Sequence, residues 1–204
     1  MTTLHEHWNA IFSAKPDQEL GWYEQDVAQT LKFLDCIPQN RPATIFLAGS
    51  GTSLLVDELA ARGHRLILND ISDEALNRLS NRIGRNSEVI WLHHDIAQSL
   101  PDHIPRIDIW IDRAVLHFLL KEEAIQGYFV NVHAAVRQGG YALLAEFSTA
   151  GASECAGLAV HRYSIEEMTG RMGMDFKLVQ HEAYTYVNPF GSLRPYLYAL
   201  YRKK

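Results

Sequence analysis

Apolar residues along this chain form two patterns that follow one another. Short apolar runs, typical of buried strands, alternate with stretches in which apolar residues recur every three or four positions, the period of an amphipathic helix. The expected strands are residues 44–48, 65–69, 88–92, 107–112, 141–147, 176–186 and 193–201, and the expected helices are residues 26–34, 52–61, 72–83, 122–136 and 164–171. Thr52 is expected to cap the second helix, and Gly63 and Gly84 are expected to end helices.

This order of elements predicts the α/β class. Strands that alternate with helices build a mostly parallel sheet, so we expect a Rossmann-like, doubly wound sheet of seven strands. Gly139-Gly140 is expected to turn the chain into the fifth strand, and a turn at Pro189-Phe190-Gly191 should close an antiparallel hairpin at the C-terminal end. We expect one domain over residues 1–204, with residues 1–40 as a helical N-terminal extension or lid and residues 41–204 as the core.

Composition narrows the possible partners. The net charge is −5 and the basic residues are scattered along the chain. Binding to a nucleic-acid backbone needs clustered positive charge, so no nucleic-acid partner is expected. The two cysteines lie far apart without CxxC spacing, which predicts a reducing, cytoplasmic location. No stretch resembles a signal peptide or a membrane span, so no membrane partner is expected. The sequence leaves monomer and homodimer both open.

No metal site is expected from the histidines. There are ten of them, yet no H-x-x-x-H or H-E-x-x-H arrangement appears. His93 and His94 are adjacent, and adjacent residues on a strand point to opposite faces.

A glycine-rich turn follows the first expected strand. Gly49-Ser50-Gly51 ends that strand, and the next strand closes on Asp70, a spacing typical of a βαβ unit whose acidic residue accepts both ribose hydroxyls. Leu54 stands where a dinucleotide site needs a third glycine, and no G-K-[ST] follows, so a phosphate-free nucleoside such as S-adenosylmethionine (SAM) fits better. An ordinary strand-to-helix turn, with Asp70 capping the next helix, is the alternative.

Five segments resemble motifs of class I SAM-dependent methyltransferases. They are Gly49-Ser50-Gly51-Thr52-Ser53, Asp70-Ile71-Ser72, His94-Asp95-Ile96, residues 112–119 (DRAVLHFL) and Gly139-Gly140. More narrowly, the whole chain resembles a bacterial subgroup akin to the thiopurine and tellurite methyltransferases. The matching pieces of that subgroup are Trp8, Gly21-Trp22-Tyr23, Phe147, Cys155-Ala156-Gly157-Leu158, Arg162-Tyr163 and the turn over residues 185–191.

The resemblance implies SAM as the cofactor and residues 41–204 as the SAM-binding core. The cofactor-binding residues that it implies are Trp22, Gly49, Ser50, Gly51, Ser53, Asp70, Ile71, Asp95, Ile96 and Asp112. Two positions depart from the family pattern. Leu47 stands where the family has an acid that holds the methionine amino group, and Ser53 replaces the third glycine; the Gly49 carbonyl and Asp112 could supply the missing contact.

A small-molecule methyl acceptor is the leading interpretation, with Asp112, Arg113 and His117 as catalytic candidates. His117 is a possible base, although the backbone could satisfy its ring instead, and Asp112 and Arg113 could simply pair. The predicted acceptor residues are Tyr23, Phe147, Cys155, Arg162 and Tyr163. Arg162 could alternatively pair with Glu146 or Glu166. Two other functions stay open: a protein-lysine methyltransferase, and a non-catalytic module that binds a nucleoside.

Overall fold

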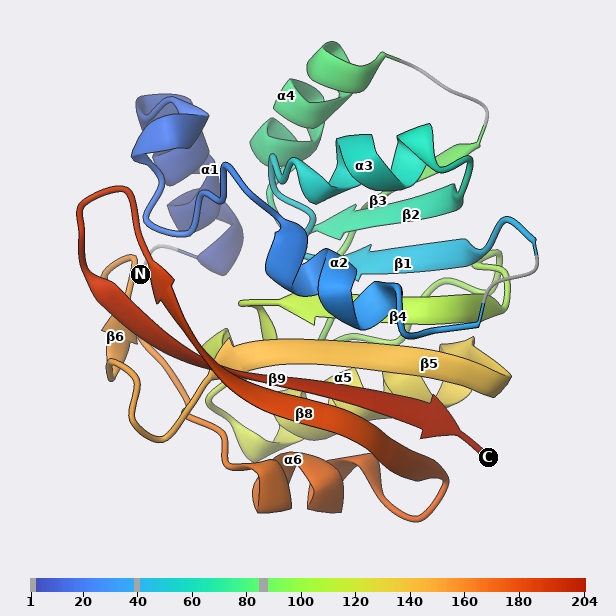
Figure 1. Cartoon of the computed structure of the whole chain (residues 1–204). Coiled ribbons are helices and arrows are strands. Elements are labelled where there is room, and N and C mark those ends of the chain that lie inside the picture. Colours follow the sequence, from blue (N-terminus) through green and yellow to red (C-terminus); the bar gives the residue numbers. More distant parts are fainter. Residues whose placement is uncertain (1–2, 39–40, 85–87) are drawn as a thin grey trace.

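A seven-stranded sheet forms the centre of the molecule (Figure 1). The computed structural model describes residues 3–38, 41–84 and 88–204. The strands of this sheet are β1 (Thr44–Ala48), β2 (Arg65–Asp70), β3 (Val89–His93), β4 (Ile107–Arg113), β5 (Val136–Phe147), β8 (Phe176–Val187) and β9 (Leu193–Lys203). Their order is β3-β2-β1-β4-β5-β9-β8, with β9 antiparallel to both of its neighbours and the other pairs parallel. The predicted Rossmann-like fold is confirmed.

Helices cover both faces of the sheet, which gives the core two layers. The helices are α1 (Leu4–Ala14), α2 (Ala28–Leu34), α3 (Leu55–Ala61), α4 (Asp73–Ile83), α5 (Glu122–Ala135) and α6 (Ile165–Met172), with single 3₁₀ turns at Asp17–Glu19 and Leu116–Phe118. Alternate strand residues face opposite sides. Leu47 of β1 packs in the cluster under α2, α3 and α4, whereas its neighbour Phe46 packs under α5 and α6.

Local signals predicted most element ends, but not those at Thr52 and at Gly139-Gly140. Gly63 and Gly84 follow α3 and α4 with φ of +77° and +74°, as helix-ending glycines should. Thr52 is not a cap: its hydroxyl donates to Asp17 Oδ1 at 2.8 Å, and α3 begins only at Leu55. Gly139-Gly140 lies inside β5, which begins at Val136. Val136 pairs with Ile107 and Tyr141 with Ile109, so residues 137–140 form a bulge, in which Gly139 has a φ of +72°.

The predicted small-residue loop over residues 151–157 contains a short hairpin. Two-residue strands β6 (Glu154–Cys155) and β7 (Leu158–Ala159) pair antiparallel around Ala156 and Gly157. In Figure 1 this hairpin lies near the edge of the sheet at which the parallel strands end.

The N-terminal segment docks on α4. Thr3 and Glu6 form a capping box that starts α1, and Phe12 is buried beside Leu20 and Ala75. Arg78 of α4 donates to the Phe12 and Lys15 carbonyl oxygens at 2.5 and 2.9 Å. The described part of the segment contains α1 and α2; residues 1–2 and 39–40 of the predicted extension lie outside the described residues.

None of the helices among the described residues is long and apolar enough to cross a bilayer.

Candidate functional site

The glycine turn after β1 is packed closely against the segment that follows β4. Gly49 and Gly51 have φ of +58° and +50°, a region that glycine adopts readily because it has no Cβ. A Cβ on Gly49 would meet Val115 Cγ2 at 2.0 Å. The backbone of β1 and the turn after β4 therefore approach each other only because residue 49 has no side chain.

Asp70 ends β2 beside this turn and binds the backbone with both carboxylate oxygens. Its Oδ2 accepts from the Gly51 N–H and its Oδ1 from the Ser72 N–H, each at 2.8 Å. Burial raises the pKa of Asp70 to about 6, although these N–H groups act in the opposite direction. The alternative role as a helix cap belongs to Ser72, whose Oγ accepts from the Ala75 N–H.

Two adjoining cavities open at this edge of the sheet. Cavity A is lined by Leu4, Trp8, Phe12, Gly21, Trp22, Gly49, Gly51, Asn69, Asp70, Ile71, His94, Asp95, Ile96, Arg113, Ala114, Val115, His117, Phe118, Leu119, Phe147, Cys155 and Tyr196. Cavity B is lined by Leu20, Trp22, Tyr23, Glu24, residues 47–55, Ile111 and Arg113. Trp22, Gly49, Gly51 and Arg113 border both, so the glycine turn separates two parts of one larger site.

Most residues predicted to bind the cofactor line these cavities. Trp22, Gly49, Gly51, Asp70, Ile71, Asp95 and Ile96 border cavity A, and Ser50 and Ser53 border cavity B. Ser50 is 3% exposed, and its Oγ has no partner among the described residues. Leu47 also borders cavity B, so the position of the missing acid does face this site.

Asp112 lies beneath cavity A instead of lining it. Its two carboxylate oxygens accept from the Val115 and Leu116 N–H groups at 3.0 and 3.1 Å, which holds the turn after β4. Asp112 and Glu146 are both fully buried on the same face of β4 and β5. Burial raises the pKa of each, that of Glu146 to about 8, and the proximity of Glu146 raises that of Asp112 further. At neutral pH the two carboxyl groups therefore retain a proton between them.

His117 lines cavity A and pairs with Glu146. Its backbone N–H donates to Glu146 Oε2 at 3.1 Å, and its ring Nδ1 lies 2.7 Å from the same oxygen. The ring stacks on Phe147, with centroids 4.7 Å apart and an angle of 9° between the planes. Its Nε2 is buried without a partner among the described residues. Burial lowers the pKa of His117 to about 3, which keeps the ring neutral.

Arg113 borders both cavities and does not pair with Asp112. Its Nε lies 2.8 Å from Glu24 Oε2, and its guanidinium lies over the rings of Tyr186 and Tyr196 at 5.0 and 5.1 Å. Burial raises the pKa of the Glu24 carboxyl, and the charge of Arg113 partly offsets that effect. The segment before α2 is thereby tied to the C-terminal hairpin.

The predicted acceptor residues divide into two groups. Phe147 and Cys155 line cavity A, and Tyr23 lines cavity B. Arg162 lines neither cavity, because its guanidinium donates to the carbonyl oxygens of Thr149 and Gly151; neither Glu146 nor Glu166 is its partner. Tyr163 is fully buried away from both cavities. The structure gives no contact that supports an acceptor role for this pair.

Glu24 and Glu146 are the site residues that the sequence pattern did not identify. Glu146 leaves a faint signal, since it is an isolated acid within the apolar run Ala142-Leu143-Leu144-Ala145 and Phe147. Glu24 follows the aromatic pair Trp22-Tyr23 but carries no motif of its own.

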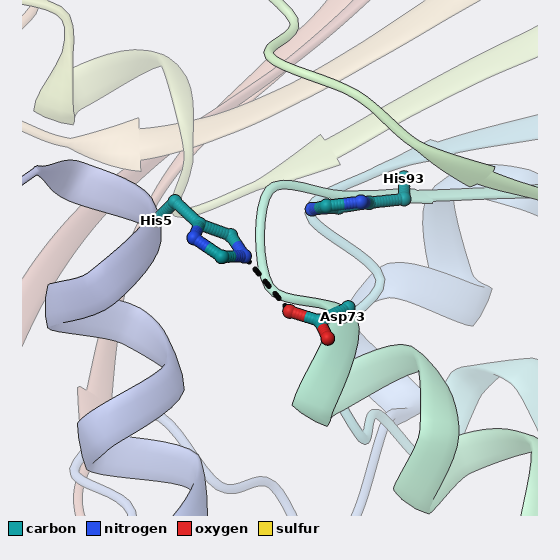
Figure 2. A group of neighbouring side chains, drawn as sticks. All are labelled: His5, Asp73 and His93. Carbon is teal, nitrogen blue, oxygen red and sulfur yellow. Dashed lines mark hydrogen bonds and ion pairs between the residues drawn. The ribbon is translucent and has the colours of Figure 1, made fainter.

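A second group of polar side chains lies beside cavity A without lining it. His5, Asp73 and His93 converge from α1, α4 and β3 (Figure 2), and their possible ligand atoms all lie within 4.8 Å of one another. The histidine pair His93-His94 does not act together: His93 Nε2 lies 3.0 Å from the Ile71 carbonyl oxygen and His94 Nε2 lies 3.4 Å from that of Gln98.

Comparison with known proteins finds a matching domain family and similar folds. Residues 45–140 match the model of a family described as a methyltransferase domain. No curated protein matches the chain.

Solved structures resemble the whole chain at low sequence identity. The N-methyltransferase NodS from Bradyrhizobium japonicum WM9, in complex with S-adenosyl-L-homocysteine (SAH), is 16% identical with a TM-score of 0.72, covering 96% of this chain and 97% of that one. The 1,6-didemethyltoxoflavin-N1-methyltransferase of Burkholderia thailandensis is 19% identical with a TM-score of 0.67, covering 98% and 84%. A TehB-like SAM-dependent methyltransferase from Corynebacterium glutamicum ATCC 13032 Kitasato is 15% identical with a TM-score of 0.64, covering 98% and 95%. At these identities the likeness is one of fold.

Proposed function

Because this chain carries a class I methyltransferase domain, an enzyme domain that uses SAM, we propose that it methylates a small molecule bound in cavity A beside His117. The observation that carries the proposal is that cavity A extends from the glycine turn and Asp70 to an aromatic end formed by Trp8, Phe118 and Phe147. One site thus offers a nucleoside pocket and, continuous with it, room for a second, apolar reactant.

The residues around the glycine turn fit the cofactor in shape and charge. Asp70 uses one lone pair of each oxygen on the backbone and keeps others for two hydroxyl donors. Asp95 and Ile96 also line cavity A, in the turn whose His94 N–H donates to the Asp70 carbonyl oxygen, and they offer an acceptor and an apolar contact for a purine amino group and ring.

Glu24 and Arg113 fit the charged amino-acid end of SAM. Both line cavity B, together with Leu47, which replaces the acid of the family pattern. An ammonium group needs a carboxylate partner and a carboxylate group needs a cation. Glu24 therefore replaces the acid missing at position 47, a role that Asp112 cannot take from beneath the cavity.

The aromatic end of cavity A is covered by α1 and by the β6–β7 hairpin. His7 of α1 lies with its Nε2 3.0 Å from the carbonyl oxygen of Ala156 in the β6–β7 hairpin. Trp8 contacts Trp22 and Phe118 edge to face, with centroids 5.4 and 4.9 Å apart. This cover suits a small acceptor better than a lysine of a folded protein. The resemblance to thiopurine and tellurite methyltransferases, and the likeness to the TehB-like and toxoflavin enzymes, support the same choice.

His117 is placed to take a proton from the acceptor. SAM supplies a methyl group already activated on a sulfonium, so catalysis needs mainly positioning. With its hydrogen on Nδ1, facing Glu146 Oε2, the ring would have its lone pair free on Nε2. Burial lowers the pKa of the ring to about 3, which makes it a weak base, so it takes the proton only as methyl transfer makes that proton acidic. Glu146 acts through His117 as a positioning residue, because the contact of its Oε2 with Nδ1 fixes the orientation of the ring. This arrangement favours an acceptor that loses a proton from O–H, N–H or S–H.

The test separates cofactor binding, acceptor class and the role of His117. Calorimetric titration should show SAM and SAH binding, and labelled SAM should methylate members of a panel of small thiols, phenols and heteroaromatic amines. His117→Gln should bind SAH within about twofold of wild type while kcat falls by roughly 10²–10⁴-fold. His133→Gln, on α5 and outside both cavities, is the matched control and should keep full activity.

Three results would contradict parts of this proposal. Absence of SAH binding would remove the cofactor assignment. Label found only in proteins of a cell lysate would favour the lysine alternative. Unchanged kcat in His117→Gln, at unchanged thermal stability, would show that the ring is structural.

A further inference from the structure

The side chains of His5, Asp73 and His93 meet at the surface where α1 contacts the core. His5 lies in the first turn of α1, Asp73 is the first residue of α4, and His93 is the last residue of β3. His5 Nε2 and Asp73 Oδ1 are 2.8 Å apart, and all the possible ligand atoms lie within 4.8 Å of one another (Figure 2). Three segments far apart in sequence thus direct two imidazoles and one carboxylate at one point.

Asn9 holds two of these groups in place from one side. Its Nδ2 lies 2.6 Å from Asp73 Oδ1 and 3.0 Å from His5 Nε2. Its Oδ1 accepts from Ser72 Oγ at 2.5 Å, which fixes the orientation of the amide. His5 Nε2 can donate a hydrogen bond to Asp73 Oδ1. A metal ion bound between the two atoms would take the place of that hydrogen.

We propose that His5, Asp73 and His93 form a binding site for a divalent transition metal ion, with Zn²⁺ as the ion best suited to two imidazoles and one carboxylate. A tetrahedral site with bonds of about 2.0–2.1 Å places ligand atoms roughly 3.3 Å apart. The widest separation must therefore close by up to about 1.5 Å, which the exposed Asp73 and His93 side chains can do by rotating. The positive end of the α4 dipole disfavours a cation here, and the first-turn residues Asp73 and Glu74 offset it.

Metal binding at this point would fix α1 over cavity A. Leu4, Trp8 and Phe12 of α1 line that cavity, whereas none of the three ligands does. A metal ion that joins His5 to the core would resist displacement of the helix without entering the cavity. The site is thus a latch on the N-terminal cover, separate from the methyl-transfer chemistry.

Direct metal binding tests the site without any enzyme assay. Metal-free protein without a histidine tag is titrated with Zn²⁺ against a chromophoric chelator, and Co²⁺ absorption reports the coordination. All proteins carry Cys36→Ser, which removes an exposed thiol that could bind the metal. We expect one ion per chain, and at least a roughly tenfold weaker affinity in His5→Ala and in His93→Ala. His181→Ala, an exposed histidine of β8 at the opposite edge of the sheet, should not change the affinity.

Hydrogen exchange then tests the latch. Zn²⁺ should slow exchange of α1 amides in the parent protein and leave them unchanged in His93→Ala. Equal Zn²⁺ affinity in the parent protein and His93→Ala would overturn the site. Site-specific binding without any change in α1 exchange would overturn the latch. Neither result depends on whether the chain methylates the proposed acceptors.

Discussion

Alanine at position 49 adds a methyl group where the glycine turn lies closest to the segment after β4. The φ of +58° at this residue costs an L-amino acid roughly 1–2 kcal/mol. The new Cβ would also lie 2.0 Å from Val115 Cγ2, so Val115 must move, at a further cost of about 1–3 kcal/mol for overpacking. Gly49→Ala should therefore lower the free energy of unfolding by about 2–5 kcal/mol in total.

Urea and thermal unfolding followed by circular dichroism measure this loss. For a chain of this size each kcal/mol lowers Tm by about 2–4 °C, so a fall of at least about 4 °C is expected. Gly63→Ala is the matched control, because its φ is +77° but a Cβ there meets nothing within 4 Å. It should show the backbone cost alone, roughly 1–2 kcal/mol.

A Val115→Ala background separates the two contributions. Removal of Cγ2 relieves the clash, so Gly49→Ala in that background should cost about as much as Gly63→Ala. The coupling free energy of the double-mutant cycle should then be about 1–3 kcal/mol. A coupling near zero, or a Gly49→Ala variant no less stable than Gly63→Ala, would refute the argument that backbone approach requires this glycine.

Two further predictions concern the buried charges of the site. SAH affinity should fall as the pH drops below about 6, because Asp70 has a pKa raised to about 6 and its protonation removes a charged acceptor. The SAH affinity of Asp70→Asn should not change over the same pH range. An equal fall in affinity in the wild type and in Asp70→Asn would contradict this role. Because this pKa is raised, the folded chain holds the Asp70 proton more tightly than the unfolded chain. The contribution of Asp70 to stability is thus complete below its ordinary pKa of 3.8 and lost as the pH rises through 6. Arg113→Met should destabilise the fold by about 3–5 kcal/mol, since it leaves Glu24 buried without its cation; Arg113→Met with Glu24→Gln should recover part of the loss in a denaturation assay, and no recovery would mean that the pair adds little.

The fold could be predicted from the sequence wherever a local rule decides the structure. Apolar periodicity located five of the six helices among the described residues and the seven main strands, but not α1. The helix ends at Gly63 and Gly84 follow from the left-handed backbone that glycine permits. Thr52 failed as a cap because a residue distant in sequence, Asp17, takes its hydroxyl. The start of β5 at Val136 was missed because Val136 pairs with Ile107 ahead of a bulge at residues 137–140, where Gly139-Gly140 gives a turn signal.

In the candidate site, too, the sequence predicted contacts within one local unit and missed contacts between distant segments. The glycine turn and Asp70 belong to one βαβ unit, so their spacing shows in the sequence. Glu146 of β5 meets His117 of the turn after β4, and Glu24 meets Arg113 although the two residues lie far apart in the sequence. Burial and partner decide what such carboxylates do, and neither can be read from a single sequence. Arg162 shows the converse, since a residue suited to anion binding instead braces the loop after β5.

The position of β9 between β5 and β8 has a consequence for how the protein forms during synthesis. Residues 196–201 of this strand are all buried, and the strand is the sole link in the sheet between β8 and β5. Until the ribosome has released β9, the nascent chain presents β5 as a long apolar strand with an open edge, which invites pairing with other chains. The ordering of the sheet therefore delays completion of the core until translation of this segment, and shortening β9 would leave the same edge open in the finished protein.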